Sequence, residues 1–302
     1  MNQQFLTELK AVTAENRIFT DEPMKKHTTF RVGGPADILV QPKGTELAAV
    51  IRLCRKYDVP YQVIGNGSNL LVGDRGIRGL VIEMLSKEDE ICVEDDCITV
   101  GAGMLLSKTA NRAAEHGLTG MEFAAGIPGR IGGAVVMNAG AYGGEMKDIL
   151  TAVTVLDQEG NEKILSAEEL ELGYRTSCIL KKGYIVTGAK IKLKHGEETA
   201  IRARMEELKK QRVEKQPLEY PSAGSTFKRP EGYFAAKLIE DAGLKGLSAG
   251  DAQVSEKHAG FVVNKGRATA KDVCELTDKI KEEVLKKSGV KLELEVVKIG
   301  EF

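Results

Sequence analysis

The chain has 302 residues, of which 42% are hydrophobic and 29% charged, a composition typical of globular rather than disordered proteins. Its 43 Lys and Arg are balanced by 44 Asp and Glu, so it lacks the cationic surplus behind non-specific nucleic-acid binding. Aromatic residues make up only 5% and Trp is absent, which argues against a base-stacking platform. Glycine is enriched, with 33 residues.

Segments that would direct the chain to a membrane are not apparent. The first ten residues are polar, unlike a signal peptide, and no stretch approaches the ~18–20 apolar residues that cross a bilayer. The five cysteines are scattered without a C-x-x-C pair, which favours a reducing cytoplasm. The four histidines form no metal-binding motif. We therefore expect a cytoplasmic protein with no metal, no membrane insertion, no nucleic-acid partner and no obligate protein partner.

Hydrophobic spacing predicts an α+β fold. In the first part of the chain the predicted elements are a helix over 2–15, a strand over 36–41, a helix over 45–57, strands over 61–64, 80–84, 91–93 and 98–100, and a helix over 105–116. The middle part is predicted to contain a hairpin of strands 152–156 and 162–165, a short helix after the capping box of Ser166 and Glu169, a strand over 184–193 and a polar helix over 197–215.

The last part is predicted to contain a helix over 233–242, strands over 252–254 and 261–263, a helix from near 269 to 288 and a closing strand over 291–299. We place the main domain boundary at the polar helix. The predicted domains are a lead-in over 1–25, a domain over 26–195 with subdomains of about 26–85 and 86–195, and a domain over 196–302.

Two glycine clusters are the chain's most distinctive pattern. Five glycines lie between Gly65 and Gly79, and nine between Gly117 and Gly144. Glycine permits tight turns and also lets backbone approach a ligand closely, so either reading explains a single cluster. Neither Gly65-Asn-Gly67 nor Gly101-Ala-Gly103 has the third glycine of a dinucleotide fingerprint, which disfavours a Rossmann domain.

The two clusters suit different parts of a ligand. Residues 64–70 can present successive backbone N–H groups to a phosphate, with Ser68 and Asn69 as additional donors. Residues 126–143 alternate small and apolar side chains, as a large flat ligand against the backbone would require, with Asn138 as an amide donor to it. Close helix–sheet packing would also select Gly and Ala, but the pattern favours the ligand.

Several motifs in order along the chain resemble one family. They are Thr28-Thr-Phe-Arg-Val-Gly-Gly, Gly65-Asn-Gly-Ser-Asn, Gly126-Ile-Pro-Gly, Asn138-Ala-Gly-Ala-Tyr-Gly, Gly173-Tyr-Arg-Thr-Ser, Ser222-Ala-Gly-Ser-Thr-Phe-Lys-Arg-Pro, Leu244-Lys-Gly, His258-Ala-Gly-Phe-Val-Val-Asn and Leu292-Glu-Leu-Glu-Val. Together they resemble the UDP-N-acetylenolpyruvoylglucosamine reductases, in the shorter class that lacks an inserted tyrosine-bearing loop. The resemblance implies a two-subdomain FAD-binding domain of the vanillyl-alcohol-oxidase type, followed by a C-terminal α+β substrate-binding domain.

The resemblance also implies a reaction in peptidoglycan precursor synthesis. NADPH would reduce enzyme-bound FAD, flavin N5 would pass hydride to C3 of the enolpyruvyl group of UDP-N-acetyl-3-O-(1-carboxyvinyl)-glucosamine, and C2 would be protonated to give UDP-N-acetylmuramate. The implied cofactor-binding residues are Ile64, Gly65, Asn66, Gly67, Ser68, Asn69, Gly126, Pro128, Gly129, Ile131, Gly132, Asn138, Ala139, Gly140 and Ala141.

Three positions match the family's catalytic motifs. Arg175 would bind the substrate carboxylate, because a planar guanidinium can do so with two hydrogen bonds. Ser225 would donate the proton to C2, and Glu295 would help Arg175 to stabilise the intermediate or relay a proton. Without the motifs these residues would pass for a surface arginine, a turn serine and a solvent-facing strand residue. Ala-Gly-Ser225-Thr-Phe is not a hydrolase G-x-S-x-G motif.

The remaining matches concern the substrate. Lys228, Arg229 and Lys245 would bind its diphosphate, and His258 and Tyr142 would contact it elsewhere; Arg229 replaces a residue that is neutral in the longer class. Two alternatives stay open, another FAD-dependent oxidoreductase of the same domain type, such as an oxidase of small alcohols, and a non-catalytic flavin- or nucleotide-binding module.

Overall fold

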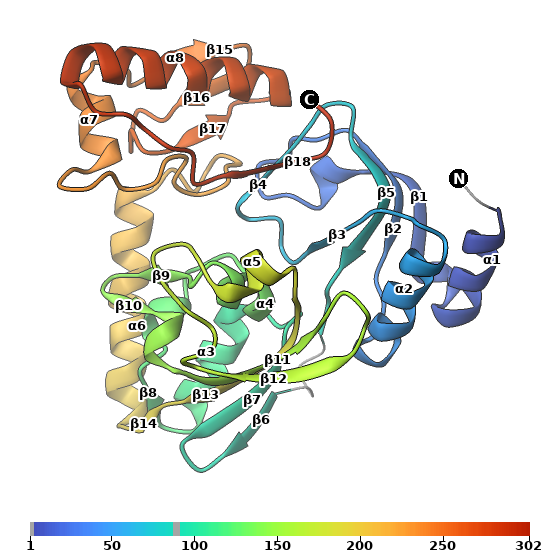
Figure 1. Cartoon of the computed structure of the whole chain (residues 1–302). Helices are drawn as coiled ribbons and strands as arrows, with labels where there is room; N and C mark the ends of the chain where they lie inside the picture. Colours follow the sequence, from blue (N-terminus) through green and yellow to red (C-terminus); the bar gives the residue numbers. More distant parts are fainter. Residues whose placement is uncertain (1–2, 87–90) are drawn as a thin grey trace. The chain divides into compact units, whose positions relative to one another are not determined.

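The computed structural model describes residues 3–86 and 91–302 (Figure 1). The chain forms two compact units. The first comprises Met1–Phe19, Ile38–Asn66 and Gly79–Arg212, and the second comprises Thr20–Asp37, Gly67–Arg78 and Val213–Phe302. Each unit is thus built from separate stretches of sequence, whereas the predicted domains are contiguous. The predicted boundaries after residues 25, 85 and 195 stay a prediction.

The secondary structure of the described residues is mixed. The α-helices are α1 (Gln3–Val12), α2 (Gly44–Lys56), α3 (Leu106–Glu115), α4 (Ile131–Val136), α5 (Cys178–Lys182), α6 (Glu198–Lys215), α7 (Ala235–Asp241) and α8 (Ala270–Ser288). Short 3-10 helices lie at Glu15–Arg17, Met24–Lys26, Glu122–Ala124 and Met146–Asp148. In the parts of the chain that the structure describes, no helix has the length and apolar character needed to cross a membrane.

The strands are mostly short. They are β1 (Ile18–Pro23), β2 (Pro35–Val40), β3 (Tyr61–Ile64), β4 (Leu70–Val72), β5 (Ile77–Glu83), β6 (Ile91–Glu94), β7 (Cys97–Gly101), β8 (Leu118–Thr119), β9 (Gly140–Ala141), β10 (Gly144–Glu145), β11 (Leu150–Leu156), β12 (Glu162–Ser166), β13 (Ile185–Lys192), β14 (Lys194–His195), β15 (Ser248–Ala249), β16 (Ala252–Val254), β17 (Val262–Asn264) and β18 (Val297–Ile299).

A five-stranded antiparallel sheet forms much of the first unit, in the order β12-β11-β13-β7-β6. Its register sets Val153 of β11 opposite Ala189 of β13, and Ala189 opposite Val100 of β7. All three side chains are buried, so this row of the sheet faces the core. α3 and α4 contribute Leu106 and Ile131, both fully buried, to the same core.

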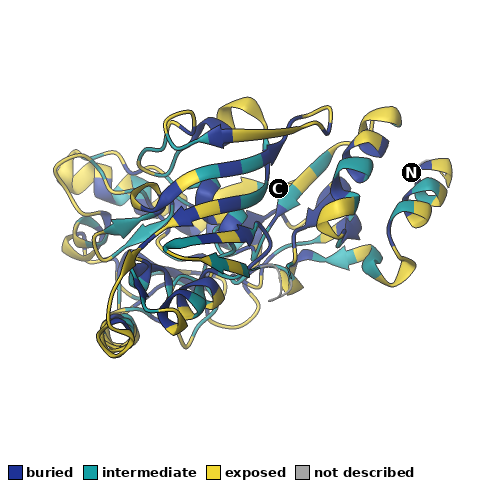
Figure 2. Cartoon of the chain, turned by 90° about the horizontal axis from the view of Figure 1, so that it is seen from below, coloured by how far each residue is buried: buried dark blue, intermediate teal, exposed yellow. Residues whose placement is uncertain are grey.

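A second core of the first unit lies between α1, α2 and neighbouring strands. The apolar residues of α2 recur at helical spacing, and Leu47, Val50 and Ile51 are fully buried together with Phe5 and Leu9 of α1. β3 runs parallel to β5, within a four-stranded sheet of order β1-β2-β5-β3. Figure 2 shows exposed residues along the outer faces of helices and buried positions between exposed ones along strands.

The second unit contains the three-stranded sheet β15-β16-β17, and its core includes the apolar face of α8. At the start of α8, Thr269 and Asp272 form a capping box, as the sequence pattern of the predicted helix allows. Asp74 adds a cap from a distant loop, because its carboxylate accepts the N–H groups of Ala270 (2.7 Å) and Lys271 (2.9 Å). The helix ends at Gly289, which adopts φ 71°.

Most predicted elements are confirmed to within a few residues. α1 matches the predicted helix over 2–15, of which residue 2 lies outside the described residues. The prediction of a short helix after Ser166 is wrong. The two reciprocal capping bonds to Glu169 form (2.8 and 3.3 Å), but Glu171 then adopts φ 48°, and the Leu170 carbonyl accepts the Cys178 N–H (2.7 Å) instead of continuing a helix.

The predicted closing strand over 291–299 is only partly present. β18 pairs in parallel with β4 over three residues. The residues before it follow a different segment, since the Lys228 N–H donates to the Glu293 carbonyl (2.8 Å) and Phe227 forms an isolated bridge with Leu294. The stretch changes partner along its length, which prevents one continuous strand. The helices α4 and α5 were not predicted.

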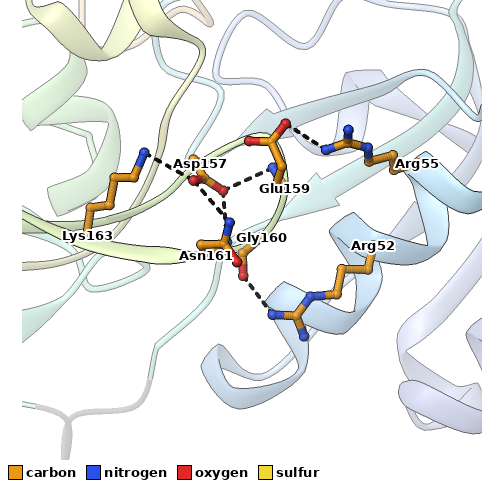
Figure 3. A network of polar contacts seen from close by, with 7 residues as sticks. All are labelled: Arg52, Arg55, Asp157, Glu159, Gly160, Asn161 and Lys163. Atoms are coloured by element: carbon orange, nitrogen blue, oxygen red, sulfur yellow. Dashed lines mark hydrogen bonds and ion pairs between the residues drawn. The ribbon is translucent and has the colours of Figure 1, made fainter.

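The β11–β12 turn contains a buried carboxylate that organises its backbone (Figure 3). One oxygen of Asp157, a residue only 5% exposed, accepts the N–H groups of Glu159 (3.0 Å) and Asn161 (2.8 Å). Its other oxygen pairs with the Lys163 ammonium at 3.1 Å. The hydrogen bond from the Asn161 N–H is the main cause that lowers the pKa of Asp157 to about 2.

The same turn contacts α2. The Arg52 guanidinium donates to the Gly160 carbonyl (3.0 Å), and Arg55 pairs with Glu159 (2.6 Å). Both contacts lie within the first unit and join its two cores through the ordered turn.

We predict that Asp157→Asn destabilises the protein at neutral pH. Because the folded pKa of Asp157 lies near 2, below its ordinary value of 3.8, the ionised carboxylate stabilises the fold above about pH 4, and this contribution is lost as the pH falls through about 2. Urea unfolding of both proteins between pH 2 and 7 measures the difference, which should narrow towards pH 2.

Glu162→Gln serves as the control, since Glu162 is an exposed carboxylate on the same hairpin. A difference between Asp157→Asn and wild type that stays constant with pH would show that the carboxylate's charge is not what stabilises the turn.

Candidate active site

The two glycine-rich loops meet in the first unit. β3 ends at Ile64, and the Asn66 side chain just beyond it donates to the Pro128 carbonyl (2.8 Å). A Cβ atom on Gly65 would lie 3.4 Å from Cβ of Arg130, in ordinary contact. The structure therefore places residues 64–66 beside residues 128–130, as a shared binding site for one cofactor requires. Residues 67–69 belong to the second unit.

Packing accounts for some of the second cluster's glycines but not for others. A Cβ on Gly132 would approach Cβ of Ala102 to 3.1 Å, and one on Gly144 would meet the Phe123 ring at 2.6 Å. By contrast, Gly133 is exposed, and a Cβ there would have no atom within 4 Å. The protein's own packing therefore leaves part of the side-chain-poor surface open, as the ligand interpretation expects.

Two arginines beside these loops were not singled out from the sequence. Arg130 donates from Nη1 to the Gly103 carbonyl (2.6 Å), while its buried Nε has no partner among the described residues. Arg212 lies against Gly126, with Cδ 3.2 Å from the position of an added Cβ. Burial lowers the pKa of both arginines. The sequence signal for Arg130 is a single charge within an otherwise apolar glycine-rich run.

These features fit a cofactor that carries phosphates. The unpaired Nε of Arg130 is a buried donor beside the two loops, and the glycines leave backbone within reach of a ligand. Among the described residues, no cluster of three or more His, Cys, Asp or Glu side chains could hold a metal ion.

Asn138 has a different side-chain role from the one expected. It is fully buried with φ 43°, and its amide donates to the Glu145 carboxylate (2.8 Å) and the Gly173 carbonyl (3.1 Å). Its side-chain oxygen accepts the Lys147 N–H (2.9 Å). The amide is thus used within the protein, and Asn138 stays a proposed cofactor residue through its backbone alone.

Arg175 lies in a tight turn. Gly173 and Thr176 exchange backbone hydrogen bonds (3.1 and 3.3 Å) across the turn, and Arg175 adopts φ 55°, a conformation uncommon for residues other than glycine. The guanidinium lies over the Tyr174 ring, 5.2 Å from its centroid. A strained backbone at a proposed catalytic residue agrees with a functional constraint on its direction.

Two buried side chains hold the two ends of the Arg175 turn. Asn138 bonds to Gly173 on one side, and the buried Ser177 hydroxyl donates to the Val136 carbonyl (2.8 Å) on the other. Val136 ends α4, so the Arg175 turn is fixed against the glycine-rich segment.

In the second unit, the structure brings the segments of Ser225 and Glu295 together. The Glu295 N–H donates to the carbonyl of Thr226, the residue after Ser225, at 2.9 Å. The Asn69 side chain donates to the Glu295 carbonyl (3.0 Å), and the Asn69 carbonyl accepts the Val297 N–H (2.9 Å). Asn69, predicted to bind the cofactor, therefore uses its side chain to hold the Glu295 segment. Ser225 itself is exposed.

The cationic substrate candidates are spread over the second unit. Lys228 pairs with Glu293 (3.3 Å), Lys245 pairs with Glu240, and the Arg229 guanidinium lies 4.1 Å from the centroid of the Phe234 ring. These are contacts of exposed or half-exposed side chains, which cost little to rearrange when a diphosphate binds.

His258 has well-defined contacts within the second unit. Its Nδ1 accepts the Gly260 N–H (3.1 Å), which assigns the ring proton of the neutral form to Nε2. Burial lowers the pKa of His258, and its ring packs edge-on against Phe261, with 5.0 Å between centroids. His258 can therefore offer one N–H donor. Tyr142 lies in the first unit, 38% exposed and with φ 54°.

We predict that Asn138→Ala lowers the free energy of unfolding by about 1–3 kcal/mol, because it leaves the Lys147 N–H without its partner and removes one of the two hydrogen bonds that the Gly173 carbonyl accepts. Denaturant unfolding measures the change. Asn111→Ala removes an exposed amide on α3 and should not destabilise. Equal stabilities of Asn138→Ala and wild type would contradict the structural role.

Comparisons with known proteins identify the family of the chain. A model of the C-terminal domain of UDP-N-acetylenolpyruvoylglucosamine reductase matches residues 216–299, and a model of an FAD binding domain matches residues 36–166. These matches confirm the expected fold class, an FAD-binding domain followed by a C-terminal domain.

Whole relatives match as well. The UDP-N-acetylenolpyruvoylglucosamine reductase of Agathobacter rectalis is 56% identical, with all of both chains covered, and that of Clostridium tetani is 53% identical over 99% of this chain and 97% of the relative. The crystal structure of the Thermus caldophilus reductase superposes with a TM-score of 0.78 at 42% identity, covering 91% of this chain and 97% of that one. The chain belongs to the UDP-N-acetylenolpyruvoylglucosamine reductase family.

Proposed function

We propose that the chain reduces UDP-N-acetyl-3-O-(1-carboxyvinyl)-glucosamine to UDP-N-acetylmuramate with NADPH and bound FAD, as a cytoplasmic enzyme of peptidoglycan precursor synthesis. Family membership supports the substrate and the reductant. The observation that carries the assignment within this chain is the hydrogen bond from the Glu295 N–H to the Thr226 carbonyl, which joins the segments of two proposed catalytic residues. The free cysteines, all five unpaired, support the compartment.

Residues of the two glycine-rich loops would hold the cofactor. A Cβ on Gly65 would meet Arg130 only in ordinary contact, and one on Gly133 would have no atom within 4 Å. Arg130 adds a buried donor to the residues of the motifs. When bound, FAD would supply the redox chemistry, the transfer of hydride from NADPH to C3 of the substrate. The protein's own contribution is to bind, orient and protonate the substrate.

Arg175 would bind the enolpyruvyl carboxylate, where negative charge grows as hydride arrives at C3. A preorganised donor directed at such developing charge lowers a barrier by about 2.7–4 kcal/mol. The tethers from Asn138 and Ser177 fix the turn before substrate binds, so little of this gain is lost to reorganisation.

Ser225 would give its proton to C2, with Glu295 assisting charge stabilisation or relaying the proton. A hydroxyl is a weak acid, so its contribution depends on close placement against a strongly basic carbon. Ser225 is exposed and so available to a substrate, while its neighbour Thr226 is buried.

We predict that Gly65→Ala leaves the stability of the flavin-free protein within about 0.5 kcal/mol but weakens FAD binding at least about tenfold. The added Cβ would lie in ordinary contact with Arg130 but would occupy backbone surface that the cofactor needs. Fluorescence titration with FAD and urea unfolding provide the two measurements.

Gly44→Ala is the matched control for this experiment, since a Cβ there has nothing within 4 Å and Gly44 begins α2, outside the sequence of both loops. Wild-type FAD affinity in Gly65→Ala would remove Gly65 from the cofactor site.

Ser225→Ala tests the reaction assigned to the chain. Flavin reduction by NADPH should proceed at the wild-type rate, whereas reoxidation by the enolpyruvyl substrate should slow by about 10²–10⁴-fold, the usual range for loss of a general acid. Stopped-flow flavin absorbance measures each half-reaction separately. Ser248→Ala, at an exposed serine of the same unit, should change neither. Unchanged reoxidation in Ser225→Ala would refute the proton-donor role.

A further inference from the structure

Thr226, next to the proposed proton donor, has each of its polar groups in a hydrogen bond. It is 2% exposed. Its N–H donates to the Gly260 carbonyl (2.8 Å), and its carbonyl accepts the Glu295 N–H (2.9 Å). Its hydroxyl accepts the Val262 N–H (2.9 Å). One residue thus connects the Ser225 segment to β17 and to the Glu295 segment, all within the second unit.

The hydroxyl fills a specific gap along one edge of β17. β16 pairs with one edge of this strand. At the other edge the Asn264 N–H donates to the Pro221 carbonyl (2.9 Å), and the Val262 N–H, two residues earlier, faces the same way. Among the described residues, no backbone carbonyl accepts the Val262 N–H at this edge. The Thr226 hydroxyl accepts it instead. Val262 is 1% exposed, so loss of the hydroxyl would leave a buried N–H without a partner.

Holding the Thr226 side chain inward has a consequence for its neighbour. Ser225 is exposed, whereas Thr226, which follows it directly, is buried. The two residues share one planar peptide unit, so fixing Thr226 also fixes the backbone on the C-terminal side of Ser225. The direction of the serine hydroxyl therefore depends on where Thr226 is fixed. The carbonyl of Thr226 sets the position of Glu295 at the same time.

We propose that Thr226 is a positioning residue for proton transfer, because its hydroxyl fixes the direction of Ser225 and the spacing between the Ser225 and Glu295 segments. This inference rests on the proposed function of Ser225 and Glu295. It concerns the hydroxyl and not the volume of the side chain, since valine has nearly the same shape as threonine but cannot accept the Val262 N–H.

The test compares Thr226→Val with Thr226→Ser in the FAD-loaded enzyme. In Thr226→Val, reoxidation by the enolpyruvyl substrate should slow by about 10- to 100-fold, the penalty expected from a small misplacement of a reacting group. Flavin reduction by NADPH should stay at the wild-type rate. The solvent deuterium isotope effect on reoxidation should rise, because proton transfer from a misplaced donor becomes more rate-limiting. Thr226→Ser keeps the acceptor and should restore reoxidation to within about threefold of wild type.

Two controls separate this role from general destabilisation. Thr277→Val removes the hydroxyl of another buried threonine in the same unit, one that bonds to the Cys274 carbonyl, and should change neither half-reaction. If Thr226→Val does not fold, Thr226→Cys replaces it; the thiol is a poor acceptor, and reoxidation should again slow while Thr226→Ser stays fast.

Wild-type reoxidation in Thr226→Val, equal slowing of both half-reactions, or a serine variant as slow as the valine variant would each overturn the inference. Ser225→Ala, measured alongside, identifies what has failed. If Ser225→Ala is slow and Thr226→Val is not, only the positioning role of Thr226 falls. If Ser225→Ala reoxidises normally, the proton-donor assignment falls, and the inference falls with it.

Discussion

Buried polar side chains that bond to backbone groups determine where the proposed catalytic residues lie. Asn138 and Ser177 fix the turn of Arg175 against the end of α4, and the Thr226 hydroxyl fixes the segment of Ser225 against β17. A buried backbone group without a partner costs about 1–3 kcal/mol, so each segment has few alternative positions that satisfy the same groups. The reactive side chains can then remain accessible while the backbone behind them is held.

The glycine-rich segment combines two uses of a missing side chain. A methyl group on Gly144 would clash with Phe123, and one on Gly132 would lie tightly against Ala102. Gly133 and Gly143, in contrast, border open space. The packed glycines bring α4 and the turns after it close to their neighbours, and the open ones keep the resulting surface free of side chains. Helix–sheet packing thus explains only one part of this cluster.

Local patterns predicted the regular elements well. The apolar spacing of α2 and the capping residues of α8 depend on near neighbours in sequence, so they could be read directly. The capping box at Ser166 shows the limit, because its two hydrogen bonds form although the helix does not. The path of the chain beyond this box is decided by the Leu170 carbonyl, which bonds to the distant Cys178 N–H.

The motifs likewise identified Arg175, Ser225 and Glu295 as candidates, but not the residues that hold them. Asn138 was expected to donate its amide to a ligand, and the structure shows that amide bonded to Gly173, 35 positions away. No sequence pattern around Thr226 or Arg130 predicted which residues they contact. Hydrogen bonds between residues so far apart in sequence form only in the folded chain, so local sequence patterns cannot predict them.

The interleaved chain has a consequence for synthesis on the ribosome. The polypeptide passes between the two units five times, and β4, which emerges early, pairs with β18, which is made much later. The Asp74 carboxylate likewise cannot cap α8 until that helix has been made. The second unit therefore cannot be completed until β18 has been made, and no contiguous fragment of the gene encodes either unit alone. The segment of β4 and Asp74 would therefore stay unpaired until α8 and β18 have emerged, so the second unit cannot fold while the residues between them are still being made.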